Sequence, residues 1–302
     1  MKECQICSEL RSLPEHLYEM AEYCTYLDNK TEYSISDNKR EVRTQVIGNW
    51  LKLASNLESV NINAWKHVGN DAFWCGAAAD QYDSDSRIFT KYSTGLTRFI
   101  YISYALEETY RFVSPRYNEV AKKAAFNATR KIKKSSVQSA LLCDQFRASE
   151  LPRNFQHIVD NFLHFFDQYY KYYQPGMSGL EEVSPNSTSY GLHIIRNLRN
   201  QMAHGVFPIM NEYIDPYDSP MIPILINLLH HASRVSVLYM QALIGNFSSD
   251  FQSYDYRAIE DAYGKPFDFF LENCNKDYAL SLHFKGHFSF KGWLECEGWP
   301  SV

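Results

Sequence analysis

The sequence predicts a mainly α-helical protein with a small β-hairpin near its C-terminus. Two observations lead to this fold class. Apolar residues recur at helical spacing in several segments between residues 94 and 244. Residues 277–296 instead alternate apolar and polar side chains around Lys285-Gly286, which is typical of a hairpin. Because the chain has 302 residues and is 45% hydrophobic and 15% aromatic, it can bury a sizeable core and is not a disordered protein.

Residues 1–92 are predicted to form a mainly helical N-terminal region. Within residues 8–27, an apolar stripe at helical spacing follows the interruption at Pro14. A second helix is expected to begin near residues 37–41. The segment 61–86 has no clear period, so we interpret it as irregular. Its spaced carboxylates lack the glycine and closing glutamate of an EF-hand and are expected in a solvated loop; they are Asp80, Asp83 and Asp85.

Residues 93–246 are predicted to form a helical bundle, and residues 247–302 a C-terminal extension that carries the hairpin. The first bundle helix covers residues 94–111 and is expected to end at Ser114-Pro115. Further helices are expected at residues 137–146, 155–173, 187–204 and 222–244. The helix at 155–173 is apolar nearly all round, which indicates deep burial or a subunit contact. One of His230 and His231 is expected to pack in the core.

The helix at residues 187–204 has one apolar and one polar face. Ile195, Leu198 and Met202 form the apolar stripe, and Gly205 follows as a helix-ending residue. Asn200 and His204 are four residues apart and therefore share the other face. The pattern predicts a helix that is buried on one side and carries reactive groups on the other.

The segment Arg199-Asn200-Gln201-Met202-Ala203-His204 resembles the signature of the HEPN superfamily, in which four to six residues separate an arginine from a histidine. The resemblance covers residues 95–246 at most. It implies a HEPN-like helical bundle, and many such domains are metal-independent RNases of defence and toxin systems. It also implies a homodimer in which two motifs face one cleft. Arg153-Asn154 and His157 are one residue short of this spacing and are given no role.

Under this resemblance the candidate catalytic residues are Arg199, Asn200 and His204. A histidine can move protons near neutral pH, and an arginine keeps its charge and can hold two phosphate oxygens. The asparagine amide could orient the imidazole. Arg196 is a candidate second phosphate contact, and Glu107 could point into the bundle and orient Arg199, although a solvated carboxylate is the alternative. This chemistry needs no metal and no cofactor.

The net charge of −5 excludes a broadly basic nucleic-acid-binding protein. A local basic cluster remains, and its charges could attract the phosphates of RNA, although a solvated surface is the alternative. The cluster comprises Lys122, Lys123, Arg130, Lys131, Lys133 and Lys134.

The seven cysteines are scattered, and the N-terminus has no apolar signal region, so we expect a reduced, cytoplasmic protein without a membrane segment. Cys4 and Cys7 form a single CxxC. A zinc site would need two more ligands that the sequence does not indicate, so unpaired thiols are the favoured interpretation.

Three functional hypotheses follow, the last being a structural helical protein in which the motif is a coincidence. The first is an endoribonuclease of a bacterial defence or toxin system, with RNA as substrate and an antitoxin or regulatory protein as a further partner. The alternative is a noncatalytic HEPN-like module that binds RNA, a nucleotide or a protein. In the alternative, His204 only caps its helix and Arg199 pairs with a carboxylate such as Glu107.

Overall fold

The computed structural model describes residues 4–29, 33–35, 41–69, 74–123, 134–208, 221–247 and 279–285, and these are mainly helical. The helices are α1 (Gln5–Glu9), α2 (Leu13–Asn29), α3 (Thr44–Ser55), α4 (Gly76–Lys123), α5 (Ser135–Cys143), α6 (Phe155–Tyr173), α7 (Tyr190–Ala203) and α8 (Met221–Phe247). A 3-10 turn covers Ala148–Glu150. Strands β1 (Tyr33–Ile35) and β2 (Glu41–Arg43) pair in antiparallel register, with Ser34 opposite Val42.

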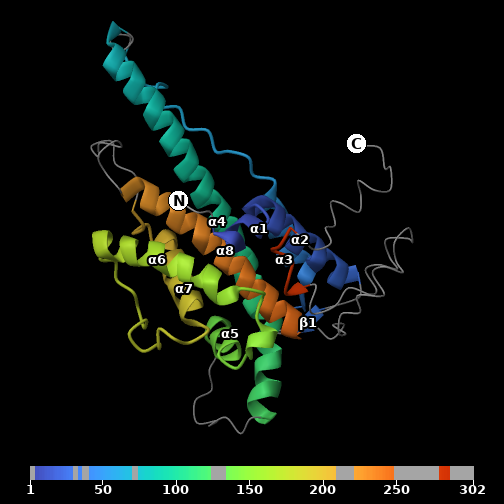
Figure 1. Cartoon of the computed structure of the whole chain (residues 1–302). Coiled ribbons are helices and arrows are strands. Elements are labelled where there is room, and N and C mark those ends of the chain that lie inside the picture. Colours follow the sequence, from blue (N-terminus) through green and yellow to red (C-terminus); the bar gives the residue numbers. More distant parts are fainter. Residues whose placement is uncertain are drawn as a thin grey trace, which may run out of the picture.

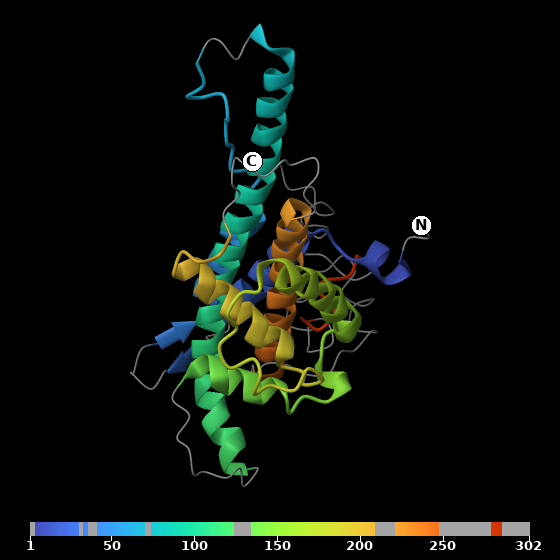
Figure 2. The same ribbon diagram turned by 90° about the vertical axis from the view of Figure 1, so that its left-hand side faces the viewer.

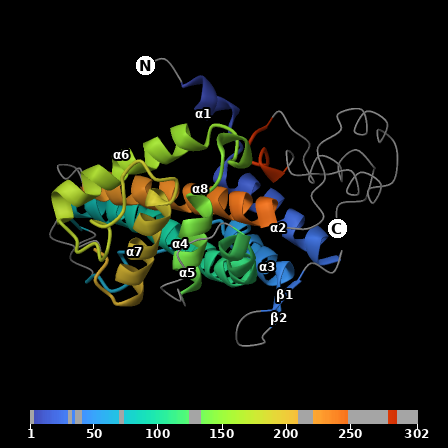
Figure 3. The same ribbon diagram turned by 90° about the horizontal axis from the view of Figure 1, so that it is seen from below.

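Helix α8 lies in the middle of the molecule, with α6 and α7 on one side and α2 and α3 on the other (Figures 1 and 3). Helix α4 packs along α8 and also contacts α3 and α5. The sequence of α8 explains its place, because it is apolar nearly all round and such a helix must be covered on every side. Leu228, Val235 and Tyr239 are completely buried in it. The predicted helices at 155–173, 187–204 and 222–244 are confirmed to within a few residues at each end.

A single hydrophobic core joins the N-terminal helices to the rest of the described chain. It runs from Leu13 and Leu17 in α2, through Phe99 in α4, to Leu282. The predicted boundary between residues 92 and 93 falls inside α4, where the helix is continuous. The packing shows no boundary at this position, and the division into three regions stays a prediction.

Helix α4 is longer at both ends than the sequence predicted. Asp80, Asp83 and Asp85 lie on its first turns and not in a loop. Pro115 lies inside the helix and does not end it. A proline removes one backbone hydrogen bond, but the apolar residues on either side of it, Phe112 and Tyr117 among them, are buried. Burial of this stretch offsets the lost bond, and the prediction of an end at Pro115 was wrong.

Residues 57–69, interpreted from the sequence as irregular in part, run back along the projecting first half of α4 (Figures 1 and 2). Hydroxyls on one face of α4 accept hydrogen bonds from backbone amides of residues 57–69. The pairs are Val60 N to Thr94 Oγ1 at 2.9 Å, Ile62 N to Thr90 Oγ1 at 3.0 Å and Ala64 N to Ser86 Oγ at 3.1 Å. Two residues of extended chain and four of helix both advance by about 6–7 Å, so the two spacings stay in step.

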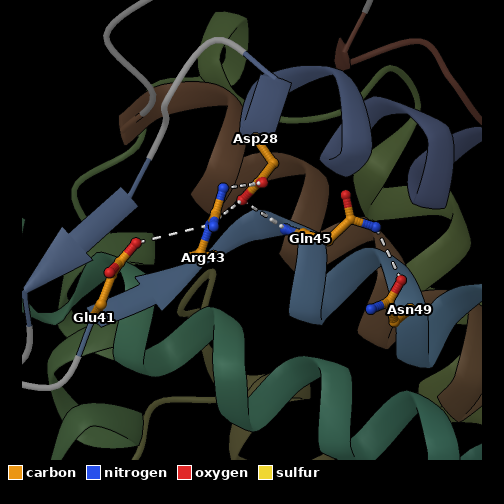
Figure 4. A network of polar contacts seen from close by, with 5 residues as sticks. All are labelled: Asp28, Glu41, Arg43, Gln45 and Asn49. Carbon is orange, nitrogen blue, oxygen red and sulfur yellow. Dashed lines mark hydrogen bonds and ion pairs between the residues drawn. The ribbon is translucent and has the colours of Figure 1, made fainter.

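Asp28, near the end of α2, binds residues at the start of α3, as Figure 4 shows. Its carboxylate accepts two hydrogen bonds from the Arg43 guanidinium, at 3.1 and 2.7 Å, and one from the backbone amide of Gln45 at 3.3 Å. The last bond satisfies an amide in the first turn of α3 that has no partner within the helix. The sequence had suggested a helix beginning at 37–41, but β2 occupies 41–43 and α3 begins at Thr44.

The described part of the predicted first arm, residues 279–285, is not a strand. It forms a turn that is buried apart from Ser281 and Lys285, in which the Phe284 amide donates to Ser281 O at 3.0 Å, and Phe284 forms an isolated bridge with Leu10. Leu282, His283 and Phe284 are all buried, so the alternation of apolar residues does not mark a strand with one buried face. His283 Nε2 donates to Arg153 O at 2.7 Å, and its Nδ1 lies 3.4 Å from Gln241 Nε2. The second arm lies outside the described residues. Among the described helices, none is both long and apolar enough to cross a membrane.

Candidate functional site

The C-terminal end of α7 is fixed by its backbone. Gly205 adopts a left-handed conformation, with φ of 68°, which favours glycine. The Gly205 amide donates to Met202 O at 3.1 Å and the Val206 amide to Gln201 O at 2.9 Å. This is the pair of bonds of a Schellman motif. The glycine that the sequence indicated as a helix end therefore closes α7, and His204 is its C-cap residue.

The buried face of α7 holds the helix against α6 and α8. Ile195 and Leu198 are buried as the apolar stripe predicted. Gln201 adds a polar tie, because its side-chain oxygen accepts from the Tyr169 hydroxyl at 2.9 Å and its nitrogen donates to Gly176 O at 3.1 Å. With this face fixed, the opposite face of α7 has a defined position.

Arg199 is held on the opposite face by two acceptors. Its guanidinium forms an ion pair with Glu107 of α4, the contact that the sequence analysis considered. A second hydrogen bond joins Arg199 Nη1 to Asn200 Oδ1 at 3.0 Å. The side chains of Arg199 and Glu107 are 34% and 27% exposed, so solvent still reaches the pair. Glu108, the neighbouring carboxylate, pairs with Arg111 within α4.

His204 is exposed at the tip of α7, and its backbone amide donates to Asn200 O at 3.0 Å. Its imidazole has no hydrogen bond to another residue in the described ranges. Arg196 lies one turn before Asn200 and is half-buried. Its positive charge is near enough to Tyr110 of α4 to lower the pKa of that hydroxyl. Burial raises the pKa of Tyr110, the Glu107 charge raises it further, and Arg196 and Arg199 oppose this rise.

A cavity of about 520 Å³ opens beside the Arg199–Glu107 pair, between α3, α4 and α7. Arg199, Met202 and Ala203 line its α7 side. Trp50 and Tyr104, whose ring centroids are 4.8 Å apart, form an aromatic wall. His204 and Asn200 do not line this cavity. The sequence had pointed to neither aromatic residue, because only the crossing of α3 over α4 brings them together.

The predicted basic cluster can be placed only in part. Lys134 is exposed immediately before α5. Lys122 and Lys123 belong to the last turn of α4, but their side chains lie outside the described residues, as do Arg130, Lys131 and Lys133 entirely. The prediction of an RNA-contact surface there stays a prediction.

A second group of reactive side chains joins the N-terminus to α6. His157 Nε2 lies 3.3 Å from Cys4 Sγ and 3.6 Å from Cys7 Sγ. Asn161, one turn further along α6, approaches both His157 and Cys7. His157 had no predicted role. The helical spacing of His157 and Asn161 is the only local sequence signal for this group. The contact of His157 with Cys4 and Cys7 joins residues about 150 positions apart in the chain.

Two further histidines lie side by side on α8. His231 stacks on Phe165, with ring centroids 4.8 Å apart and an interplanar angle of 19°. Burial lowers the pKa of His231 to about 4. Its neighbour His230 is exposed. His231 is only half-buried and neither histidine belongs to the core, so the expectation that one of the two packs in the core was wrong.

Comparisons of the chain with protein-family models, with curated proteins and with solved structures found no match.

Proposed function

We propose that this protein is a metal-independent endoribonuclease of the HEPN type, acting in a defence or toxin system. One observation carries the proposal. An exposed histidine, His204, ends a rigidly held helix, and the arginine five residues before it is oriented by Glu107 and Asn200. The resemblance implied this trio of Arg199, Asn200 and His204. His204 is exposed and the side chain of Arg199 is 34% exposed, and this access to solvent is a condition that the chemistry needs.

In this proposal RNA supplies the nucleophile. The imidazole of His204 takes the proton of a ribose 2′-hydroxyl, and the 2′-oxygen attacks the adjacent phosphorus. The guanidinium of Arg199 stabilises the charge that develops on the phosphate oxygens. The bond from phosphorus to the 5′-oxygen then breaks, and that oxygen takes a proton from an acid. The products are a 2′,3′-cyclic phosphate and a 5′-hydroxyl.

The acid for the last step is the reason to expect two chains at one site. Each chain offers one His204, and a single imidazole must act as base and then as acid. A homodimer that brings two α7 tips to one cleft supplies an imidazole for each task. The exposed Val206, 67% accessible beside His204, is apolar surface that such a contact would cover.

RNA cleavage in the presence of EDTA tests the proposal. Wild-type protein is expected to cleave single-stranded RNA and to leave cyclic phosphate ends, identified by their resistance to a phosphatase that removes only monoesters. His204→Ala is expected to lose at least about a hundredfold in rate, as general acid–base groups contribute. His67→Ala, which changes another exposed histidine, is the matched control. Cleavage that survives in His204→Ala, at unchanged RNA binding, refutes the catalytic assignment.

A noncatalytic HEPN-like module is the second candidate, and one observation favours it. Arg199 is already neutralised by Glu107, and the pair lines a cavity that His204 does not reach. In that case the cavity, with Trp50 and Tyr104 on its wall, binds RNA, a nucleotide or a protein side chain, and His204 only ends α7. Equal RNA binding without cleavage by wild type and His204→Ala identifies this function.

A further inference from the structure

We propose that Cys4, Cys7 and His157 bind one zinc ion, with a water molecule or another small exogenous ligand in the fourth position. The three ligand atoms lie within 4.8 Å of one another. They are one nitrogen and two sulfurs, the donor types that zinc prefers in proteins. The site is separate from the α7 site and does not depend on the ribonuclease proposal.

The distances between the ligand atoms suit a tetrahedral ion. With Zn–S bonds of about 2.3 Å and Zn–N bonds of about 2.0–2.1 Å, a sulfur and a nitrogen ligand are about 3.6 Å apart. The observed separations from His157 Nε2 are 3.3 Å to Cys4 Sγ and 3.6 Å to Cys7 Sγ. Both nitrogen–sulfur separations are therefore close to those expected around a bound zinc ion.

The packing of α1 gives an independent reason for a metal. No residue of α1 is buried and only Ile6 is half-buried, so apolar contacts contribute little to holding this five-residue helix on the bundle. Its C-terminal end is tied by backbone bonds, from Arg11 N to His283 O at 2.9 Å and from Lys285 N to Glu9 O at 2.9 Å. At its N-terminal end, Cys4 and Cys7 meet α6 through His157 and Asn161. A shared ion would fix that end to α6.

Asn161 would support the site from outside the ligand set. Its side-chain nitrogen lies 3.7 Å from Cys7 Sγ and donates a hydrogen bond to it. Such donors stabilise the charge of a metal-bound thiolate. Arg234 brings a positive charge to the cavity that Cys7 lines. Cys7, Asn161 and Arg234 also line one cavity of about 440 Å³, through which an exogenous fourth ligand can reach the ion.

Zinc binding releases protons from the ligands. Zinc coordinates thiolates and a neutral imidazole, so two thiol protons leave to solvent when the ion binds at neutral pH. No oxidant or reductant takes part. Oxidation of Cys4 and Cys7 to a disulfide is a competing fate for the same thiols and would abolish the site, so the protein must be purified and tested under reducing conditions.

Zinc content and cobalt spectra test the proposal. Wild-type protein, purified under reducing conditions and passed through a metal-free column, is expected to retain about one zinc per chain. After removal of the zinc, titration with Co²⁺ should give a thiolate-to-cobalt charge-transfer band and the visible bands of a tetrahedral site, saturating at one ion. Absence of both zinc and these bands overturns the proposal.

Variants locate the ion. Cys7→Ser and His157→Ala are expected to reduce retained zinc at least about tenfold, because each removes a ligand. Cys75→Ser and His164→Ala are matched controls, each changing an exposed residue of the same type, the histidine on the same helix. Circular dichroism of each variant shows whether the bundle is folded. Zinc retained by folded Cys7→Ser and His157→Ala, or lost equally from the controls, refutes these ligands.

Discussion

The distance between α7 and α8 is set by a glycine, and replacing it should have a large and specific cost. A Cβ added at Gly191 would lie 2.9 Å from the hydroxyl oxygen of Tyr239, whereas ordinary contacts begin at 3.4 Å. That hydroxyl is not free to move, because it donates a hydrogen bond of 2.6 Å to Thr188 O and its ring is fully buried. Gly191→Ala must break this bond or push α7 away from α8.

The magnitude follows from these contacts. Leaving the buried hydroxyl and carbonyl unpaired costs about 1–3 kcal/mol, and overpacking costs about 1–3 kcal/mol. Alanine offsets up to about 1 kcal/mol of this through its higher helix propensity. Because the substitution incurs one of these two costs, we expect Gly191→Ala to lower the free energy of unfolding by about 1–2 kcal/mol. In a Tyr239→Phe background the added Cβ meets only ring carbons, at 3.5 and 3.6 Å, so the same change should cost almost nothing.

Urea denaturation of the four proteins in this double-mutant cycle, followed by circular dichroism, measures the coupling. Gly95→Ala is the control for the helix-propensity gain, because its Cβ would meet Leu229 at an ordinary 3.8 Å and the variant should be unchanged or slightly stabilised. If Gly191→Ala costs the same with tyrosine or phenylalanine at residue 239, the close approach to the hydroxyl does not determine this packing, and the reasoning fails.

Three further predictions concern the site, the pH response and the α2–α3 turn. Glu107→Gln should leave RNA binding within about threefold and lower the cleavage rate about tenfold or more, because Arg199 loses the group that orients it; equal single-turnover rates would contradict this role. The pKa of His231 is about 4 in the folded protein and about 6.5 when unfolded. The stability that the neutral imidazole contributes is therefore complete above pH 6.5 and is lost as the pH falls toward 4. About 2.5 kcal/mol of it is lost at pH 4.5. His231→Gln should flatten the dependence of unfolding free energy on pH in this range, and an unchanged slope would count against it. Asp28→Ala should destabilise the protein by about 1–3 kcal/mol, since the Gln45 amide loses its acceptor. Glu41→Ala, which changes an exposed partner of Arg43, is the control. Equal melting temperatures of the two variants would show that the cap contributes little.

The sequence predicted the helices whose apolar stripes are complete. The helix at 155–173 was placed correctly because Phe162 and Phe166 lie one turn apart on one buried face. The end of α7 was also predictable, since Gly205 gives a local stop signal that the backbone then uses. These features depend on residues close in the chain, and local periodicity detects them.

What the sequence did not predict depends on contacts distant in the chain. Asp83 was expected in a loop, yet the first half of α4 is a helix whose hydroxyls and carboxylates face residues 57–69; Trp65 Nε1 donates to Asp83 Oδ1 at 2.8 Å. Pro115 was expected to end the helix, which instead continues because its flanks are buried. In the candidate site, Arg199 and His204 share one helix and could be chosen from spacing. The cavity wall at Trp50 and the meeting of Cys4 with His157 could not.

Pro115 gives α4 a place where it can bend. Its nitrogen has no hydrogen to offer the carbonyl of Arg111, so the backbone ladder has a missing rung one turn beyond Glu108. The N-terminal side of α4 is held in the core at Phe99 and Tyr110, so a bend at Pro115 would displace the C-terminal end of α4 and leave Glu107 beside Arg199.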